Sequence, residues 1–270
     1  MDVSVIILNY KSARLVKYCL RSLFRALPKA SLEIIVVDNP SKEDLEPIEK
    51  TLVSSPVPAQ LIRSPRNGGY AAGNNLGIMA ARGRYVLIAN PDIVFQAGTI
   101  DRLVEYLDTH PKAAIAAPAL RNPDGTPQPS CFRFHSWRIP LYRRTPLGRL
   151  KWAQPELKHF EMADTPVVQP TDVDWIMGSC VMVRRAAMDQ VGLLDEDFFM
   201  YFEDTDWCRR FHNAGWEVVC VPDAEVIHYY SRASAGSHGL SALFSPLARV
   251  HIKSAFHYFY KYAHAHGHKI

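Results

Sequence analysis

Short apolar runs alternate with amphipathic segments along the first 120 residues of the chain. The apolar runs lie at Val3–Leu8, which is rich in β-branched residues, and at Glu33–Val37, Gln60–Arg63, Tyr85–Ala89 and Ala113–Ala117. Runs of this length and composition predict strands that are buried on both faces of a sheet. The segments between them predict helices. The chain is therefore expected to fold as βαβ units, with a Rossmann-like, mostly parallel central sheet and helices on both faces.

Size and composition exclude several classes of protein. The 270 residues suffice for one large α/β domain, and the 48% hydrophobic and 21% charged content excludes a disordered chain or a coiled coil. The formal net charge of +4 is too small to indicate nucleic acid, which is not expected as a partner. The five cysteines form no CxxC pair, which favours a reducing, cytoplasmic environment. No apolar stretch approaches the ~20 residues that cross a bilayer, so membrane contact is expected to be peripheral.

Polar clusters follow three of the predicted strands directly, and these are Asn9-Tyr10, Asp38-Asn39 and Asn90-Pro91-Asp92. The carboxyl ends of parallel strands meet at one edge of a sheet, where open α/β folds bind their ligands. Any one of these clusters could be an ordinary turn. Three clusters at equivalent places favour a binding site.

An acidic segment at residues 195–210 holds six carboxylates beside the apolar run 198–202. Glu203 and Asp204 fall in the first turn of a predicted helix, where acidic side chains suit the helix dipole. The apolar neighbours would also raise a carboxylate pKa, which is a property of a general base. Both interpretations remain open from composition alone.

Glycine and asparagine residues surround the predicted start of a helix over Ala71–Ala81, in the sequences Asn67-Gly68-Gly69 and Gly73-Asn74-Asn75. Glycines there would let a phosphate approach backbone N–H groups. The spacing is not GxGxxG, no Walker lysine follows and no GxSxG occurs, which excludes dehydrogenase, P-loop and serine-hydrolase motifs. His228 ends a short apolar run, and an isolated histidine of this kind is more often structural than a ligand.

The second half of the chain is less regular. Residues 122–170 are rich in proline, and we expect a long functional loop or lid there. Further strands are predicted at Cys180–Val183, Glu217–Val221 and Glu225–His228, with a basic, aromatic helix over Leu243–His264.

Taken in order, these segments resemble family 2 glycosyltransferases of the GT-A fold, and especially the rhamnosyltransferase-like branch that builds bacterial cell-surface polysaccharides. The resemblance covers about residues 3–230 and rests on the motifs SVIILNY, IIVVDN, NGGYAAGNNLGI, YVLIANPDI, WIMGSCVMVRR, DEDFFMYFEDTDWCRR and VIHY. It implies a nucleotide-sugar donor, a divalent cation (Mg²⁺ or Mn²⁺) and inversion at the anomeric carbon. It also implies a nucleotide-sugar-binding half (1–121), an acceptor-binding and catalytic half (122–230) and a basic aromatic tail (231–270).

The resemblance also implies roles for individual residues. The backbone around Asn9 and Tyr10 would line the base pocket, and Asp38 and Asn39 would contact the nucleoside. The residues expected near the ribose and diphosphate are Asn67, Gly68 and Asn74. Those expected to shape the acceptor or donor sugar pocket are Trp175, Gly178 and Ser179.

The implied metal motif and catalytic base rest on four further positions. Asn90 and Asp92 stand where the family has its DxD motif, of which only Asp92 keeps a carboxylate. His228 matches a metal ligand of the family. Asp204, the second member of the pair that begins with Glu203, matches the catalytic base.

We therefore expect an inverting transferase that moves rhamnose from dTDP-rhamnose to a cell-surface polysaccharide or lipid-linked glycan. A transferase of the same family that uses a UDP-sugar is one alternative. A non-catalytic member that only binds nucleotide or glycan is another, and the amide at Asn90 motivates it. A nucleotidyltransferase is disfavoured because residues 9–12 contain no glycine.

The tail carries an aromatic and basic pattern that leaves three outcomes open. It fits peripheral contact with an anionic membrane, on the inner face of the cell membrane. It equally fits a helix packed on the fold or a homodimer contact. The residues concerned are Phe244, Phe256, Tyr258, Phe259, Tyr260 and Tyr262, with Arg249, Lys253 and Lys261.

Overall fold

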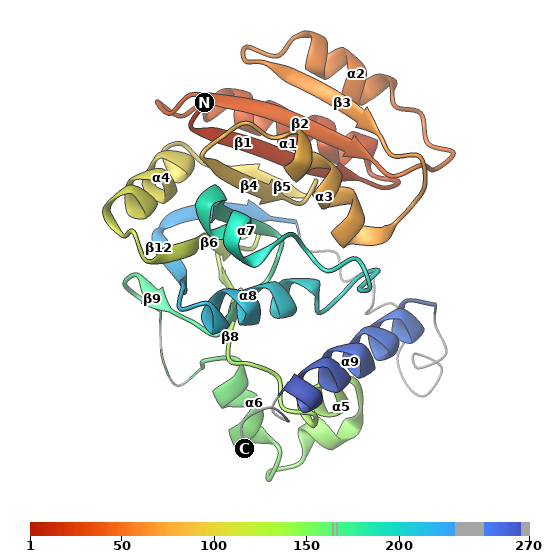
Figure 1. The fold of residues 1–270 in the computed structure, drawn as a ribbon, viewed down its shortest axis with the longest axis vertical. Helices are drawn as coiled ribbons and strands as arrows, with labels where there is room; N and C mark the ends of the chain where they lie inside the picture. Colours follow the sequence, from red (N-terminus) through yellow and green to blue (C-terminus); the bar gives the residue numbers. More distant parts are fainter. Residues whose placement is uncertain (164, 166, 230–245, 266–270) are drawn as a thin grey trace.

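A mixed β-sheet forms the centre of the molecule (Figure 1). The structure is a computed structural model that describes residues 1–163, 165, 167–229 and 246–265. In spatial order the main strands are β3 (Ala59–Arg63), β2 (Leu32–Asp38), β1 (Val3–Asn9), β4 (Tyr85–Ala89), β11 (Cys180–Arg184), β6 (Ala113–Arg121), β12 (Glu217–His228) and β5 (Ile93–Phe95).

Four of the seven neighbouring pairs among these eight strands are parallel, as the alternation of strands and helices predicts. Strand β1 pairs in parallel with β2 and β4, β2 with β3, and β12 with β6. Strand β11 runs antiparallel between β4 and β6, and β5 runs antiparallel to β12. The predicted fold class is confirmed. Two details differ: the two short strands predicted at residues 217–228 form one strand with register shifts, and β5 was not predicted.

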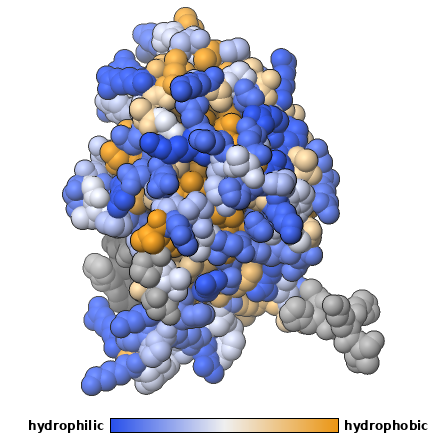
Figure 2. All heavy atoms as spheres, turned by 90° about the vertical axis from the view of Figure 1, so that its left-hand side faces the viewer, coloured by the Kyte–Doolittle hydropathy of each residue, from blue (hydrophilic) through white to orange (hydrophobic). Residues whose placement is uncertain are grey.

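Helices cover both faces of the sheet because successive strand residues point to opposite sides. In β1, Val5 and Ile7 pack with one set of helices, while Ile6 packs with the other. The first set is α1 (Ala13–Arg25), α2 (Glu46–Val53) and α4 (Thr99–Thr109). The second set is α3 (Gly69–Ala80), α7 (Arg185–Val191) and α8 (Glu203–Asn213). Figure 2 shows a mostly hydrophilic face on which apolar residues form small separate groups.

The proline-rich stretch is more ordered than predicted. It contains β7 (Pro127–Gln128), β8 (Cys131–Phe132), α5 (Ile139–Arg144), a 3-10 turn η1 (Pro146–Arg149) and α6 (Gln154–Phe160). Pro140, Pro146 and Pro155 lie at the starts of these short helices, where the missing N–H carries no penalty. Strand β8 pairs with β10 (Trp175–Ile176), and the Phe132 and Trp175 rings stack 4.6 Å apart. We refer to residues 127–163 as the lower lobe.

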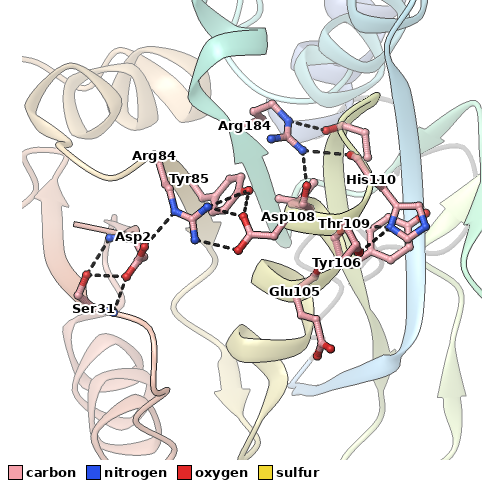
Figure 3. Close-up of polar contacts among 12 residues, drawn as sticks. Asp2, Ser31, Arg84, Tyr85, Glu105, Tyr106, Asp108, Thr109, His110 and Arg184 are labelled. Atoms are coloured by element: carbon pink, nitrogen blue, oxygen red, sulfur yellow. Dashed lines mark hydrogen bonds and ion pairs between the residues drawn. The ribbon is translucent and has the colours of Figure 1, made fainter.

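Ion pairs and hydrogen bonds tie together the edge of the sheet where β1 and β4 begin (Figure 3). The guanidinium of Arg84 bonds to Asp108 and lies 2.9 Å from Asp2, which links the starts of both strands to the end of α4. Arg184, at the end of β11, donates to the carbonyl oxygens of Leu107, His110 and Ala113. Its charge therefore caps the end of α4, and the polar groups of this edge are occupied in holding the fold.

Helix α9 (Pro246–Ala265) packs on the fold with its inner face. Tyr258 and Tyr262 are buried in a cluster with Phe198 and Phe202. The start of the predicted helix at Leu243, together with Phe244, lies outside the described residues. Among the helices that the structure describes, none is long and apolar enough to cross a membrane.

Candidate active site

The candidate site lies at the edge of the sheet where the parallel strands end. Strands β1, β2 and β4 bring Asn9, Asp38 and Asn90 to this edge. Strand β11 begins at the same edge because it runs antiparallel to β4, with Cys180 opposite Ala89. The turn that precedes β11 therefore joins the site, and Asn90 N–H donates to the carbonyl oxygen of Ser179 at 2.8 Å.

The expected nucleoside contacts form one hydrogen-bonded group. Asn9 Nδ2 donates to Asp38 Oδ1 at 2.7 Å, and Asn39 N–H donates to the Asn9 carbonyl oxygen at 2.9 Å. Burial raises the pKa of the Asp38 carboxyl above its usual value, and the hydrogen bond from Asn9 opposes that shift. Tyr10 stands beside this group with 45% of its surface exposed. The exposed ring of Tyr10 and the polar atoms of the hydrogen-bonded group are thus offered together to a ligand.

The start of α3 makes a close approach to the acidic segment. Gly69 has φ +86°, and a Cβ there would lie 2.0 Å from the Phe199 carbonyl oxygen, so only glycine fits. The Gly69 N–H donates a hydrogen bond to Asn67 Oδ1 at 3.0 Å, and the N–H of the next residue, Tyr70, donates to the Phe199 carbonyl oxygen at 2.7 Å. Gly68 is the N-cap of this helix. The N-terminus of α3 is thereby fixed at the site, where its N–H groups and dipole favour an anion.

Asp92 and His228 meet at this edge, as the resemblance implies. Asp92 Oδ1 lies 3.3 Å from His228 Nε2, and His228 is 2% exposed. On the other side of the ring, Nδ1 lies 2.7 Å from Gln128 Oε1. With that oxygen as acceptor, Nδ1 carries the proton and Nε2 keeps its lone pair for a metal.

The donor set suits a divalent cation of the Mg²⁺ or Mn²⁺ type. Neighbouring ligands of an octahedral cation with bonds of about 2.1 Å lie about 3 Å apart, close to the observed separation. A second group, formed by Asp195, Asp197 and His257, also has its ligand atoms close together. Lys261 Nζ lies 2.6 Å from Asp195 there, and its ammonium group already neutralises that carboxylate. The pair of Asp92 and His228 is therefore the better metal candidate.

Glu203 and Asp204 differ in exposure and in their hydrogen bonds. Glu203 is buried, with 5% of its surface exposed, whereas Asp204 is partly exposed. Asp204 accepts hydrogen bonds from Gly178 N–H at 3.0 Å and from Thr205 N–H at 2.7 Å. These bonds orient the carboxylate, and its remaining lone pairs can accept a proton.

The two carboxyls also differ in their ionisation. Burial raises the pKa of Glu203 well above its usual value, and the charge of Asp204 raises it further. Burial raises the pKa of Asp204 too, but the N–H donors of Gly178 and Thr205 oppose the shift. Asp204 is therefore the member that ionises first and that substrate can reach, which suits a general base.

Several of the predicted site residues have buried polar atoms without a hydrogen-bond partner in the described part of the chain. Buried polar atoms are normally paired, so such a group of unpaired atoms indicates a site for a polar ligand. These atoms are Asn39 Oδ1, Asn74 Oδ1, Asp92 Oδ1, Ser179 Oγ and Glu203 Oε2.

The structure places Trp175 apart from the other predicted residues. Its ring is buried among the aromatic side chains of the lower lobe, and its Nε1–H donates to the Arg133 carbonyl oxygen at 2.9 Å. A role in shaping the sugar pocket through this ring stays a prediction. Gly178 and Ser179, a few residues later, lie at the edge itself.

Sequence reasoning missed residues that orient the site. The hydroxyl of Tyr70 donates to the carbonyl oxygen of Gly178, beside Asp204. Tyr70 directly follows Gly68 and Gly69, and this position next to predicted site residues could have indicated that it belongs to the site. Gln128 had no such signal, because its contact with His228 depends on the pairing of β7 with β6.

Comparison with known proteins identifies a family. Residues 4–192 match the family model described as glycosyl transferase family 2, and residues 158–242 match that of glycosyl transferase family group 2.

Several curated relatives are named as rhamnosyltransferases. An N-acetylglucosaminyl-diphospho-decaprenol L-rhamnosyltransferase of Mycobacterium tuberculosis is 35% identical over 56% of this chain and 48% of its own length. The dTDP-rhamnosyl transferase RfbF of Shigella flexneri is 26% identical over 88% of this chain and 74% of its own length. The chain thus spans about half the length of the mycobacterial protein.

Solved structures of glycosyltransferases share the fold. The mannosyltransferase of Pyrobaculum calidifontis, in complex with GDP-Man and Mn²⁺, gives a TM-score of 0.60 at 18% identity over 86% of this chain and 58% of its own. GalNAc-T7 with UDP, GalNAc and Mn²⁺ gives 0.68 at 15% identity, over 88% and 45%. The chain therefore has the GT-A fold.

Replacing Glu203 by glutamine should stabilise the protein at neutral pH. The raised pKa means that the folded protein holds this proton more tightly than the unfolded chain, so wild-type stability falls as pH rises through both pKa values. Glu203→Gln removes that loss. We expect its Tm to exceed that of the wild type by ~2–4 °C at pH 8 and by much less at pH 4, measured by circular dichroism.

The exposed Glu161→Gln variant is the matched control and should change Tm little at either pH. An equal shift of Glu203→Gln at both pH values would show that burial of this charge is not the cause.

Proposed function

Because the chain belongs to glycosyl transferase family 2, we propose that it is an inverting, metal-assisted enzyme that transfers rhamnose from dTDP-rhamnose. The proposed acceptor is a cell-surface polysaccharide or a lipid-linked glycan. Rhamnose is favoured because the mycobacterial and Shigella relatives are named as rhamnosyltransferases. The name of the mycobacterial relative, with its diphospho-decaprenol group, supports a lipid-linked acceptor.

One chain of contacts carries this proposal. Asn90, in the candidate metal turn, is hydrogen-bonded to Ser179 at 2.8 Å. The preceding residue, Gly178, is hydrogen-bonded to Asp204 at 3.0 Å. The turn that includes Asp92 and the candidate base are thus connected through two backbone groups. A transferase needs such a connection because the donor phosphates and the acceptor hydroxyl must be held in a fixed position relative to each other.

The proposed reaction uses Asp204 as a general base. An acceptor hydroxyl oxygen attacks C1 of the sugar from the face opposite the leaving group, and a new C1–O bond forms. The bond between C1 and the diphosphate oxygen breaks, and its electron pair leaves with the nucleoside diphosphate. Asp204 accepts the hydroxyl proton, and attack from the opposite face inverts the configuration at C1.

Asp92 and His228 would hold the divalent cation, which would supply positive charge to offset the charge that develops on the departing diphosphate. Gln128 would keep His228 in the tautomer that binds metal. The N-terminus of α3, fixed by Gly69, would present further N–H groups to the phosphates. Asp38 and Asn39 would contact the base, and they suit thymine or uracil because the two bases present the same pairing edge.

The outer face of α9 supports peripheral contact with an anionic membrane. Ile252, Phe256 and Tyr260 recur every four residues and are 38%, 75% and 68% exposed. Arg249 and Lys253 fall on the same side of the helix by its period, opposite the buried Tyr258. An apolar stripe with basic neighbours fits the boundary between anionic headgroups and acyl chains. We place the working enzyme in the cytoplasm at the inner face of the membrane.

The donor is expected to be identifiable by its slow hydrolysis in the absence of acceptor. Purified protein is incubated with dTDP-rhamnose, UDP-galactose, UDP-GlcNAc or GDP-mannose, each with Mn²⁺, Mg²⁺ or EDTA, and released nucleoside diphosphate is measured. We expect release from dTDP-rhamnose with either metal and none with EDTA. Release from a UDP-sugar alone would reassign the donor. Metal-independent nucleotide binding without any turnover would favour a binding protein.

Asp204→Asn should lower kcat by ~10²–10⁴-fold with little change in the KM for the donor, because the base acts only as the acceptor attacks. Asp189→Asn, at an exposed position on α7, is the matched control and should keep wild-type kcat. Circular dichroism reports whether each variant folds. Near wild-type turnover by a folded Asp204→Asn variant would remove Asp204 from the mechanism.

Vesicle flotation tests the outer face of α9. The protein is expected to float with vesicles of phosphatidylcholine and phosphatidylglycerol, and much less with phosphatidylcholine alone. Substituting Phe256→Ser and Tyr260→Ser together should weaken binding at least ~10-fold, since each ring loses its burial in the membrane. Tyr18→Ser, exposed on α1, should not weaken it.

A dimer in solution that the same double substitution dissociates would assign this face to a second copy of the chain instead. Equal flotation of the wild type and the double variant would also contradict the membrane proposal.

A further inference from the structure

The turn that leads into the candidate base has an unfavourable backbone conformation. Tyr201 and Phe202 have φ values of +72° and +69°, and Phe202 is the N-cap residue of α8, directly before Glu203. Residues with a side chain rarely adopt the left-handed region, and two in succession persist only where neighbouring structure holds them. The position of Asp204 therefore depends on whatever packs against residues 198–202.

On one side, this turn is held by α3. Tyr70 N–H donates to the Phe199 carbonyl oxygen at 2.7 Å, and the absence of a side chain at Gly69 permits that approach. On the other side, it is held by α9. Ser254 Oγ donates to the Met200 carbonyl oxygen at 2.9 Å, and the rings of Phe202 and Tyr258 lie 5.3 Å apart.

A buried carboxylate on α8 anchors α9 beside the site. Asp206, whose side chain is fully buried, lies two residues after Asp204. Its Oδ1 accepts a hydrogen bond from the Tyr262 hydroxyl at 2.8 Å and lies 2.8 Å from Lys261 Nζ, while Arg210 Nε donates to Oδ2 at 2.8 Å. A buried charge is stable only when it is paired and hydrogen-bonded, so Asp206 requires these donors.

Lys261 also contacts the beginning of the same segment. Its Nζ lies 2.6 Å from Asp195 Oδ2. One ammonium group therefore joins Asp195, which precedes the turn, to Asp206, which follows it. Arg210 comes from α8 itself and holds Asp206 within its own helix. Lys261 and Tyr262, by contrast, come from a part of the chain more than 50 residues away.

We propose that Lys261 and Tyr262 are positioning residues for catalysis, which hold residues 198–206 in the conformation that presents Asp204 to the acceptor. This inference rests on the proposed role of Asp204. The two residues touch neither donor nor acceptor and act through Asp206 and the turn. The tail helix is then a part of the active-site framework, whatever its outer face binds.

The role can be tested by two readouts on Lys261→Met and Tyr262→Phe. Hydrogen exchange of the backbone amides in residues 198–206 should be at least ~10-fold faster in Lys261→Met than in the wild type, because the turn loses a bond at each end. In donor and acceptor kinetics, kcat should fall ~10-fold or more while the KM for the donor changes less than twofold. The ion pairs of Lys261 and the hydrogen bonds of Tyr262 go to Asp195 and Asp206, whereas the proposed base contacts lie at the ends of β1 and β2.

Three controls separate positioning from general stability. Lys112→Met, at an exposed position outside the site, should leave exchange and kcat unchanged. Lys261→Arg keeps the charge and should recover most of the lost kcat. Turnover is divided by the concentration of nucleotide-binding sites, so that unfolded protein does not lower the apparent kcat.

Wild-type exchange and kcat in Lys261→Met and Tyr262→Phe would overturn the proposal. So would a lowered Tm with unchanged kcat per binding site, which is the result of a purely structural contact. A wild-type protein that transfers no sugar would instead refute the proposed function. In that case the exchange experiment would still decide whether α9 holds the turn.

Discussion

The antiparallel pairing of β11 with β4 is the contact on which the candidate site depends. Because β11 runs against its neighbours, Cys180 lies opposite Ala89 at the edge where the parallel strands end. Gly178 and Ser179 are thereby placed between the turn of Asn90 and the first turn of α8. A parallel strand at this place would carry the same two residues to the opposite edge, and Asp204 would lose its contact with the rest of the site.

One edge of the sheet stabilises the fold, and the opposite edge carries the candidate active site. At one edge, the charges of Arg84 and Arg184 are used in ion pairs and helix capping. At the other, Glu203 is buried with no hydrogen-bond partner for Oε2 among the residues that the structure describes, and the two residues before it are in the left-handed region. Such features oppose folding and are usually found at functional sites. Helix α9 contributes contacts that keep this second edge in place.

The sequence was most informative where local patterns decide the structure. Buried β-branched runs predicted the parallel strands, and the polar residues that follow them predicted the edge that gathers Asp38 and Asp92. Contacts between distant segments could not be read in this way. The position of β11 in the sheet, the hydrogen bond from Gln128 to His228 and the anchoring of α9 by Asp206 depend on pairings that leave no periodic signal. The lower lobe was missed because its prolines begin helices rather than end them.

A crystal structure of the protein with dTDP and Mn²⁺ would test the location of the site most directly. The expected result is one Mn²⁺ within about 2.2 Å of both Asp92 and His228, with the thymidine beside Asp38 and the diphosphate near the start of α3. A nucleotide bound elsewhere, such as in the groove between α1 and α2, would contradict this assignment. So would a cation held by Asp195 and His257 in place of the two proposed ligands.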